Sequence, residues 1–341
     1  MRVAVYYSND DIRLEDRPRP APGPGELLMR VESSGVCGSD VMEWYRKPRA
    51  PQVLGHEVSG VVEQIGQGVT AFANGDRIVT THHVPCNDCH YCRRDLHNVC
   101  ESMHRTTFDP GGFSEFVRLP AVNVERGTFK LPDHVGFDAA TFVEPLACVL
   151  RGQRAVGVTA GDTVLVIGAG ISGILQIQAA RARGVARVLA VDTQPARLEM
   201  ARRFGADQTW PAEDMTADRL REANEGRLAD RVLVCTGARP ALEGALALID
   251  HGGSLLVFAP LVPGETLALD VNDLWKRGVS IVHSYAGPPD DMRLALDWIA
   301  AARIDVDSMV THRLPLAETA TGFRLVASGG ESLKVLIEPG R

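Results

Sequence analysis

The sequence has no excess of basic residues, no long apolar run and few aromatic side chains. Its 36 lysine and arginine residues are outnumbered by 43 aspartate and glutamate residues, which gives a net charge of -7. A protein that binds nucleic acid through its phosphates needs a basic face, so this balance argues against that partner. No apolar stretch reaches the length of a membrane span, and the N-terminal residues lack a signal-peptide pattern. We therefore expect a cytoplasmic protein with neither a membrane nor a nucleic-acid partner.

The length and texture of the chain predict two domains of α/β class. A chain of 341 residues is long enough for about two domains. Up to about residue 150, short alternating segments interrupted by proline and glycine favour a mostly β region. Residues 151–287 instead alternate apolar strands with helical patterns, which is typical of a parallel sheet covered on both faces. The residues from 288 onward are expected to return to the first domain.

A glycine-rich segment at residues 168–173 predicts a dinucleotide site. It directly follows the apolar strand 164–167 and opens a helix, and Asp192 ends the next strand nineteen residues beyond Gly173. This context is the Rossmann fingerprint, in which the helix N-terminus binds the pyrophosphate, whereas the same glycines in a flavodoxin-like sheet are only a turn. The candidate cofactor-binding residues are Gly168, Gly170, Ile171, Ser172, Gly173, Asp192 and Arg197.

Asp192 favours NAD over NADP as the cofactor. Its carboxylate is placed to accept hydrogen bonds from the adenosine ribose, and its charge repels a 2′-phosphate. The residues directly after it are Thr193, Gln194 and Pro195, so no arginine follows until Arg197, one turn into the next helix.

Four cysteines lie within fifteen residues, at Cys86, Cys89, Cys92 and Cys100. In a large chain without a secretory pattern, such clustering indicates metal binding before it indicates disulfides. Four thiolates close a tetrahedral zinc site and leave no open position, so the site is expected to be structural. His90 and His97 lie within the same segment, so a mixed ligand set is also possible. A separate alternative is four reduced thiols that bind no metal.

Three further fragments are unremarkable one by one: Cys37 in Cys-Gly-Ser-Asp, His56-Glu57 after a glycine, and Glu144 in Glu-Pro-Leu. Together with the four-cysteine segment, the glycine fingerprint and Thr311-His312-Arg313, they occur in one order along nearly the whole chain. In this order the sequence resembles the zinc-containing medium-chain dehydrogenase/reductase superfamily, and within it the sorbitol and polyol dehydrogenases.

The resemblance implies a GroES-like, mostly-β catalytic domain at 1–150 and 288–341, with a structural-zinc lobe at about 84–102. It also implies a Rossmann NAD-binding domain at 151–287 and a homo-oligomer, either a dimer or a tetramer. Two zinc ions per chain are implied, one structural and one catalytic. By this resemblance Cys37 and His56 are expected to hold the catalytic zinc and either Glu57 or Glu144 to complete the site, and the hydroxyl of Ser39 is expected to take the proton of the alcohol.

The implied substrate is a small polyhydroxylated molecule with a secondary hydroxyl, oxidised by NAD or formed in the reverse reaction. The candidate pocket residues are Trp44, Phe108, His283 and Tyr285. Two positions depart from the family. Met42 stands where a histidine often passes the proton to solvent, so we expect exit through the ribose hydroxyls or a water held by Glu144. Ser284 stands where polyol dehydrogenases carry an arginine, which argues against sorbitol itself.

Two enzymatic alternatives remain, an amino-alcohol dehydrogenase of the L-threonine type and a cyclitol or aminocyclitol dehydrogenase. An alternative from a different class is a binding protein that is scaffolded by zinc and has the same fold but no catalytic activity. A metal analysis and a substrate screen distinguish these hypotheses.

Overall fold

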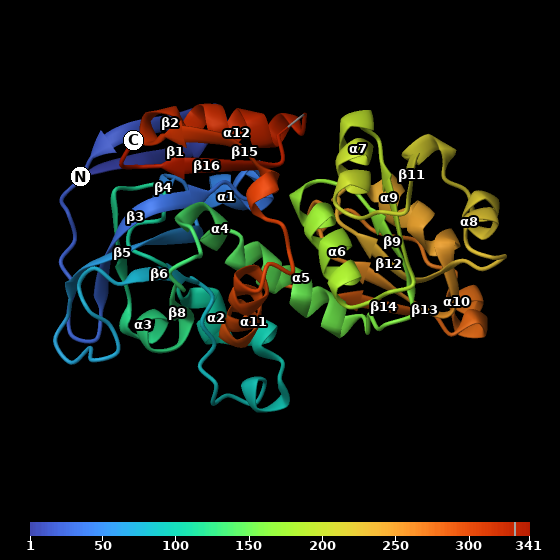
Figure 1. The fold of residues 1–341 in the computed structure, drawn as a ribbon, viewed down its shortest axis with the longest axis horizontal. Helices are drawn as coiled ribbons and strands as arrows, with labels where there is room; N and C mark the ends of the chain where they lie inside the picture. The colour runs from blue at the N-terminus through green and yellow to red at the C-terminus, as the bar shows by residue number, and fades with distance from the viewer. Residues whose placement is uncertain (331) are drawn as a thin grey trace. The chain divides into compact units, whose positions relative to one another are not determined.

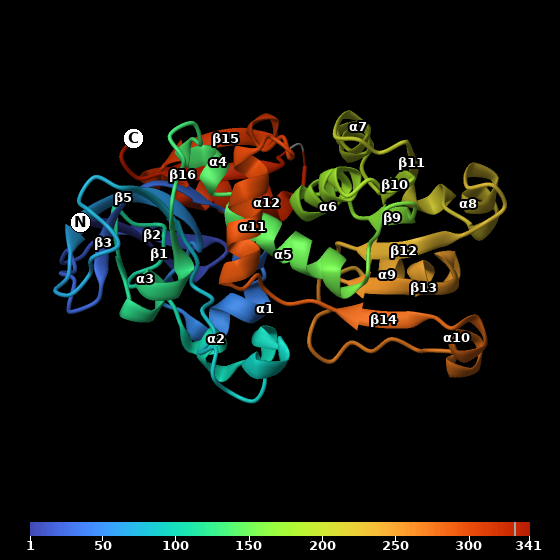
Figure 2. The same ribbon diagram turned by 60° about the horizontal axis from the view of Figure 1, so that its bottom comes forward.

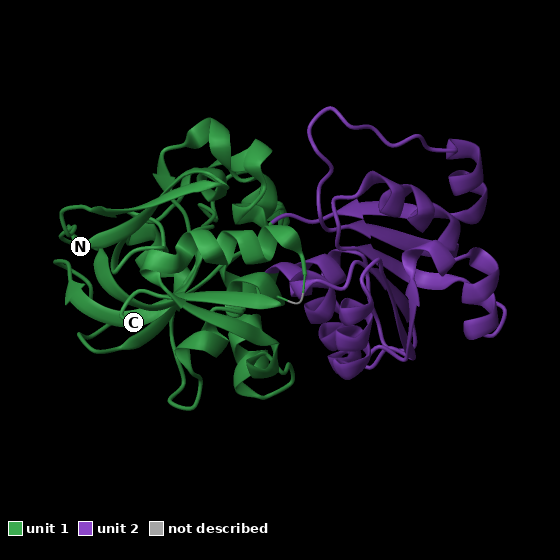
Figure 3. Cartoon of the chain, turned by 90° about the horizontal axis from the view of Figure 1, so that it is seen from above, with its two compact units in different colours: residues 1–147, 286–341 green, residues 148–285 purple. Residues whose placement is uncertain are grey.

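The computed structural model describes residues 1–330 and 332–341, which form two compact units (Figure 3). Unit 1 consists of Met1–Ala147 and Ala286–Arg341, and unit 2 of Cys148–Tyr285. The boundaries expected from the sequence, after 150 and after 287, lie close to these positions. Among the described residues, no helix is both long and apolar enough to cross a membrane.

Unit 2 is built on a parallel sheet of six strands in the order β11-β10-β9-β12-β13-β14. This is the strand order of a dinucleotide-binding Rossmann fold, with β9 as its first strand, so the predicted fold class is confirmed. The strands are β9 (Thr163–Ile167), β10 (Arg187–Asp192), β11 (Gln208–Pro211), β12 (Ala229–Val234), β13 (Ile249–Val257) and β14 (Ser280–His283).

Helices cover both faces of this sheet, as its fully buried central strand requires. Leu165 of β9 packs in one cluster with Leu220 and Leu242 from two helices, whereas Val166, on the opposite face, lies against the start of α6. The views of α6 and α7 show them side by side (Figures 1 and 2). The helices of unit 2 are α6 (Ile171–Ala182), α7 (Pro195–Arg203), α8 (Ala217–Ala223), α9 (Arg239–Ala245) and α10 (Val271–Arg277).

Unit 1 is mostly β, as expected. Its larger sheet has the order β15-β16-β3-β5-β6-β8, with β7 also paired to β3, and its smaller sheet has the order β2-β1-β4. The strands are β1 (Arg2–Ser8), β2 (Asp11–Asp16), β3 (Leu27–Gly35), β4 (Gln52–Val53), β5 (Glu57–Ile65), β6 (Arg77–Thr80), β7 (Phe116–Leu119), β8 (Thr128–Lys130), β15 (Val310–Pro315) and β16 (Lys334–Glu338).

The helices of unit 1 are short except for the two near the C-terminus (Figure 1). They are α1 (Glu43–Arg46), α2 (Glu101–Arg105), α3 (Ala121–Gly127), α4 (Phe137–Ala140), α11 (Pro289–Ala300) and α12 (Thr319–Ser328). A further helix, α5 (Val143–Ala155), contains the boundary between Ala147 and Cys148.

The register of β3 against its neighbours prepares the functional site. Gly35, the last residue of β3, pairs with Glu57, the first residue of β5, in antiparallel register. Gly35 also pairs with Leu336 of β16 on its other side. Because β3 ends where β5 begins, the residues just after β3 and just before β5 are brought together.

Candidate functional site

Cys37 caps a single turn of 3-10 helix, η1 (Gly38–Asp40), that follows β3. Its sulfur accepts hydrogen bonds from the backbone N–H and the hydroxyl of Ser39, both at 3.4 Å. The Asp40 carboxylate accepts the backbone N–H of Cys37 at 3.1 Å and completes the cap. The turn therefore holds the sulfur and the Ser39 hydroxyl side by side.

His56 lies directly before β5 and is held by a buried carboxylate. Its Nδ1 is 3.4 Å from Oδ1 of Asp40, whose side chain is fully buried. Burial favours the neutral imidazole, but Asp40 and the Cys37 sulfur outweigh it and raise the pKa of His56 well above its usual value. A contact at Nδ1 leaves Nε2 as the ligand atom, which is how carboxylates orient metal-binding histidines. The same negative field favours a metal cation.

Glu57 is paired with a residue that the sequence did not suggest. The ammonium group of Lys334, the first residue of β16, donates to Oε2 of Glu57, and both side chains are almost completely buried. The ammonium also lies 5.0 Å from the ring centre of Phe142. Lys334 reaches Glu57 across β3 because Gly35 has no side chain there. A Cβ at Gly35 would overlap both charged groups.

Cys37, His56 and Glu57 together fit a metal ion. Each offers one ligand atom, and the three atoms lie within 4.8 Å of one another. A thiolate, an imidazole and a carboxylate are donors that zinc accepts, and three protein ligands leave the fourth position open, as in catalytic sites. Glu144, in the first turn of α5, is buried, but its carboxylate is not among the ligand atoms that come together with those of Cys37, His56 and Glu57 in the described residues.

The first two predicted pocket residues lie in unit 1, and a third side chain accompanies them. Trp44 is 38% exposed on α1, and Phe108 is buried in the core with its ring centre 6.0 Å from that of His82. The ring of His82 lies 4.9 Å from that of His56. Burial lowers the pKa of His82 well below its usual value, and the neighbouring histidines add to the effect. His82 is thus a neutral neighbour of the site that the sequence analysis missed.

The other two predicted pocket residues, His283 and Tyr285, belong to unit 2. His283 ends strand β14 and is exposed, and Tyr285 is 40% exposed. Both leave the parallel sheet at the carboxyl end of its last strand, the edge at which such sheets bind ligands.

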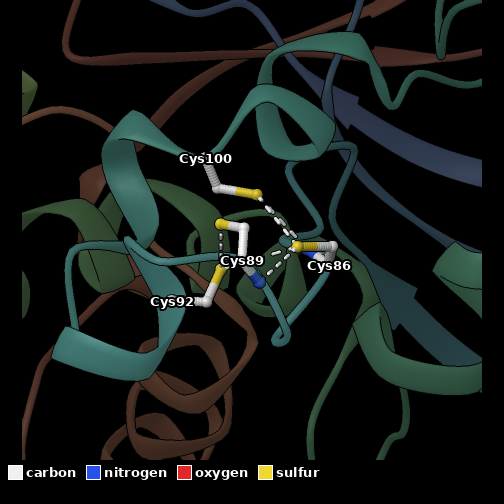
Figure 4. Close-up of side chains that lie close together, drawn as sticks. All are labelled: Cys86, Cys89, Cys92 and Cys100. Carbon is white, nitrogen blue, oxygen red and sulfur yellow. Dashed lines mark hydrogen bonds between the residues drawn. The ribbon is translucent and has the colours of Figure 1, made fainter.

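The four clustered cysteines converge in unit 1, as Figure 4 shows. The Cys89–Cys92, Cys86–Cys100 and Cys86–Cys92 sulfurs are 3.5, 3.6 and 3.9 Å apart. A tetrahedral zinc with Zn–S bonds of about 2.3 Å separates its sulfurs by about 3.8 Å. The spacing therefore fits a closed four-thiolate zinc site.

Backbone amides prepare one of these sulfurs for the metal. The N–H groups of Asp88 and Cys89 donate to Sγ of Cys86 at 3.5 and 3.3 Å. They lower the pKa of the Cys86 thiol to about 6, because hydrogen bonds to the charged form stabilise it. Cys86 is therefore a thiolate near neutral pH, the form that binds zinc.

The backbone of the glycine fingerprint has a conformation and a close approach that only glycine permits. Gly168 has a φ of +93°, a conformation that favours glycine. A Cβ at Gly173 would overlap the carbonyl oxygen of Gly168, so only glycine lets α6 begin this close to β9. Ile171 and Ser172 form the first turn of α6, whose N-terminal N–H groups are available for a phosphate.

Asp192 is buried at the end of β10 and also holds the glycine loop in place. Its two oxygens accept the N–H groups of Ala169 at 2.7 Å and Gln194 at 2.9 Å. The guanidinium of Arg197 lies over the same loop. A Cβ added at Gly170 would be 3.3 Å from its Nη1. Asp192 and Arg197 thus both lie beside the glycine fingerprint.

Comparisons with known proteins agree with this architecture. Residues 23–133 match the alcohol dehydrogenase GroES-like domain, and residues 172–301 match the zinc-binding dehydrogenase family. The chain is 31% identical to human sorbitol dehydrogenase over 345 residues, covering 98% of this chain and 94% of that protein. It is also 31% identical over 348 residues to a protein named as a probable D-xylulose reductase A of Neosartorya fischeri, covering 96% and 93%.

A zinc-binding dehydrogenase of Sinorhizobium meliloti, solved with NADP bound, has a TM-score of 0.87 and 28% identity over 99% of both chains. The family matches cover most of the sequence, and their domains correspond to the mostly-β and Rossmann architectures described above. The chain belongs to the zinc-binding dehydrogenases of the medium-chain dehydrogenase/reductase superfamily, among relatives that act on polyols.

Proposed function

We propose that the protein is a zinc- and NAD-dependent dehydrogenase that interconverts a secondary alcohol and a ketone on a small polyhydroxylated substrate. The observation that carries the proposal is the convergence of Cys37, His56 and Glu57 around one point, with the Ser39 hydroxyl beside the Cys37 sulfur. A scaffold without catalysis has no need of an open three-ligand site with a proton acceptor at its edge.

The chemistry assigns one role to each group. Zinc held by Cys37, His56 and Glu57 would supply a Lewis acid, which lowers the pKa of a bound water or alcohol. Ser39 would accept the hydrogen bond of the substrate hydroxyl, whose proton leaves to water, and bound NAD would take the hydride of the carbinol carbon. The products are a ketone, NADH and one proton released to water.

Lys334 bears on which glutamate completes the site. Zinc with one thiolate and two carboxylates has a formal charge of -1, which weakens its Lewis acidity. The buried ammonium of Lys334 restores neutrality when Glu57 and Glu144 are both ionised. We propose that Glu57, paired with Lys334, completes the metal site with Cys37 and His56, and that Glu144 holds a water beside the metal, from which the proton leaves.

The test of the function is a screen of NAD reduction over polyols, cyclitols, sugar acids, amino alcohols and L-threonine. We expect turnover of at least one polyol or cyclitol and zinc at two ions per chain. Turnover of L-threonine alone supports the amino-alcohol alternative. Two zinc ions without turnover of any of these compounds support the non-catalytic scaffold.

Replacing Asp192 tests the cofactor preference. Asp192→Asn removes the charge that repels a 2′-phosphate and weakens the ribose contact, so kcat/KM with NAD is expected to fall about 10- to 100-fold. The ratio of kcat/KM for NAD to that for NADP is expected to fall with it. The measurement is steady-state kinetics with both cofactors.

The matched control is Asp207→Asn. Asp207 also accepts a backbone N–H of β10, that of Val188 at 2.8 Å, but at the opposite end of the strand. This change is expected to leave the cofactor ratio unaltered. A wild-type protein that prefers NADP contradicts the assignment of Asp192.

We further propose that the protein forms a homodimer, or a tetramer built from such dimers, through the β14 edge of unit 2. Within the described chain β14 pairs on one side only, and open strand edges invite pairing. Apolar side chains lie exposed on α10 and the loop before it, with Trp275 at 76% and Val271 at 70%. Such patches mark interaction surfaces, and a self-complementary patch produces a dimer.

Trp275→Glu is expected to weaken this association about 10- to 100-fold, because a buried tryptophan is a common interface hot spot. Sedimentation equilibrium across a concentration series measures the effect. Leu14→Glu, which changes a side chain that is 45% exposed on unit 1, is the control and is expected to leave association unchanged. A monomeric wild-type protein overturns the proposal.

The cysteines also lead us to propose a cytoplasmic location. Four of the seven serve one candidate metal site and Cys37 serves the other. Thiols reserved for zinc require a reducing compartment, where they escape oxidation to disulfides. Fractionation of cells that produce the protein is the direct test.

A further inference from the structure

The hydroxyl of Ser39 is held by an arginine that the proposed function does not use. From the end of α1, Arg46 donates through Nε to the carbonyl oxygen of Ser39 at 2.9 Å and through Nη2 to the Ser39 hydroxyl, also at 2.9 Å. Nη2 lies 3.4 Å from the buried Asp40 carboxylate, and the Arg46 side chain is only 14% exposed.

These contacts fix the direction of every hydrogen bond at the Ser39 oxygen. A hydroxyl has one proton and two acceptor lone pairs, and a guanidinium only donates. Arg46 therefore occupies one lone pair, and the Ser39 proton points to the Cys37 sulfur at 3.4 Å. One lone pair remains, so Ser39 faces an incoming hydroxyl as an acceptor.

The guanidinium is itself held in place before any substrate arrives. Its carbon lies 4.7 Å from the centre of the Tyr45 ring, and the Gln52 amide donates to the carbonyl oxygen of Arg46 at 2.9 Å. Upstream, the side chain of Asn9 donates to the carbonyl oxygen of Val41 at 2.8 Å. Support of this kind lets a site act without rearrangement.

We propose that Arg46 is a positioning residue for the reaction. It fixes the Ser39 hydroxyl as a hydrogen-bond acceptor for the substrate hydroxyl and places a permanently charged guanidinium beside the Ser39 oxygen. Arg46 itself transfers no proton during the reaction, because its guanidinium stays protonated. The inference rests on the proposed function and concerns the same site, where Met42 leaves this loop without a proton-relaying histidine.

Arg46→Ala is the test, and Arg49→Ala is its matched control. Arg49 also lies over the Tyr45 ring, at 4.9 Å, but no bond to Ser39 is described for it. We expect Arg46→Ala to lower kcat about 10- to 100-fold on a substrate that the screen identifies, with a much smaller change in KM. Zinc content and melting temperature are expected to stay near those of the wild type, and Arg49→Ala to match the wild type throughout.

Chemical rescue separates positioning from folding. Millimolar methylguanidinium is expected to restore much of the kcat of Arg46→Ala and to leave Arg49→Ala unaffected. Arg46→Lys, which keeps the charge and loses the two-pronged contact, is expected to fall between wild type and Arg46→Ala. An Arg46→Ala protein with wild-type kcat, or one that loses zinc and is not rescued, overturns the proposal.

A binding measurement keeps the inference independent of the substrate. Trifluoroethanol presents a hydroxyl but gives up no hydride easily, so its affinity for the zinc-loaded protein with NAD can be measured by calorimetry. We expect affinity to fall at least about 10-fold in Arg46→Ala and to be unchanged in Arg49→Ala. If the screen finds no substrate, the proposed function fails, and this comparison alone decides the role of Arg46: equal affinities overturn it.

Discussion

Lys334→Met is expected to lower the free energy of unfolding of unit 1 by about 3–5 kcal/mol, because it leaves the buried carboxylate of Glu57 without its counter-charge. Both side chains are almost completely buried, so water cannot take the place of the ammonium. The cation–ring contact with Phe142 is lost as well. Calorimetric melting and urea titration measure the change on protein without zinc at the Cys37 site, because a metal there would itself compensate the Glu57 carboxylate.

Two variants isolate the cause of this loss. The double variant Glu57→Gln/Lys334→Met removes both charges and is expected to recover much of the stability, since a buried neutral pair avoids the cost of an isolated charge. Lys130→Met breaks the ion pair between Lys130 and Asp76, in which the Lys130 side chain is 53% exposed. This change is expected to lower the free energy of unfolding by less than about 1 kcal/mol. Equal stabilities for Lys334→Met and Lys130→Met contradict the importance of the buried pair.

The pair also shows what the sequence alone could not predict. Glu57 and Lys334 are 277 residues apart, and their meeting depends on the registers that place β16 beside β3 and β3 beside β5. Nothing near Lys334 distinguishes it from a lysine on an exposed strand. Its burial follows from strand pairing and from the missing side chain of Gly35, which a single sequence does not reveal.

Local signals, in contrast, were sufficient for the dinucleotide fingerprint. The apolar strand, the glycines and the helix are consecutive, so the predicted strand 164–167 appears as β9 and the helix that the glycines open appears as α6 (Ile171–Ala182). Cys37 and His56 were joined only by resemblance, since neither fragment indicates a metal alone. The structure adds the physical cause, the antiparallel pairing of Gly35 with Glu57.

The prediction of one helix boundary was wrong. The apolar run Ala241–Ile249 predicts one continuous helix, whereas α9 ends at Ala245, a 3-10 turn follows, and Ile249 already begins β13. A short apolar run fits a buried helix and a buried strand equally well. The edge strands β11 and β14 were not predicted, because their short, partly polar sequences lack the apolar run of a central parallel strand.

Cys37→Ala is expected to abolish turnover, by more than about a thousandfold, while the protein stays folded and retains one zinc per chain. The thiolate is one of three protein ligands at an open site, and such sites serve chemistry more than folding. Cys37 also caps η1, so Cys37→Ser is the companion variant: it keeps an acceptor for the Ser39 N–H and removes the thiolate. Similar loss in both variants assigns the effect to the metal and not to the cap.

Cys92→Ala is expected to do the opposite. It opens a closed four-thiolate site whose binding energy is also folding energy, so the zinc lobe loses its metal and the melting temperature falls by several degrees or more. Residual activity is expected in the fraction that stays folded, because the Cys37 site is intact. Zinc per chain, melting temperature and kcat, measured on both variants, separate the two roles. If Cys37→Ala unfolds the protein while Cys92→Ala is silent, the catalytic and structural assignments are reversed.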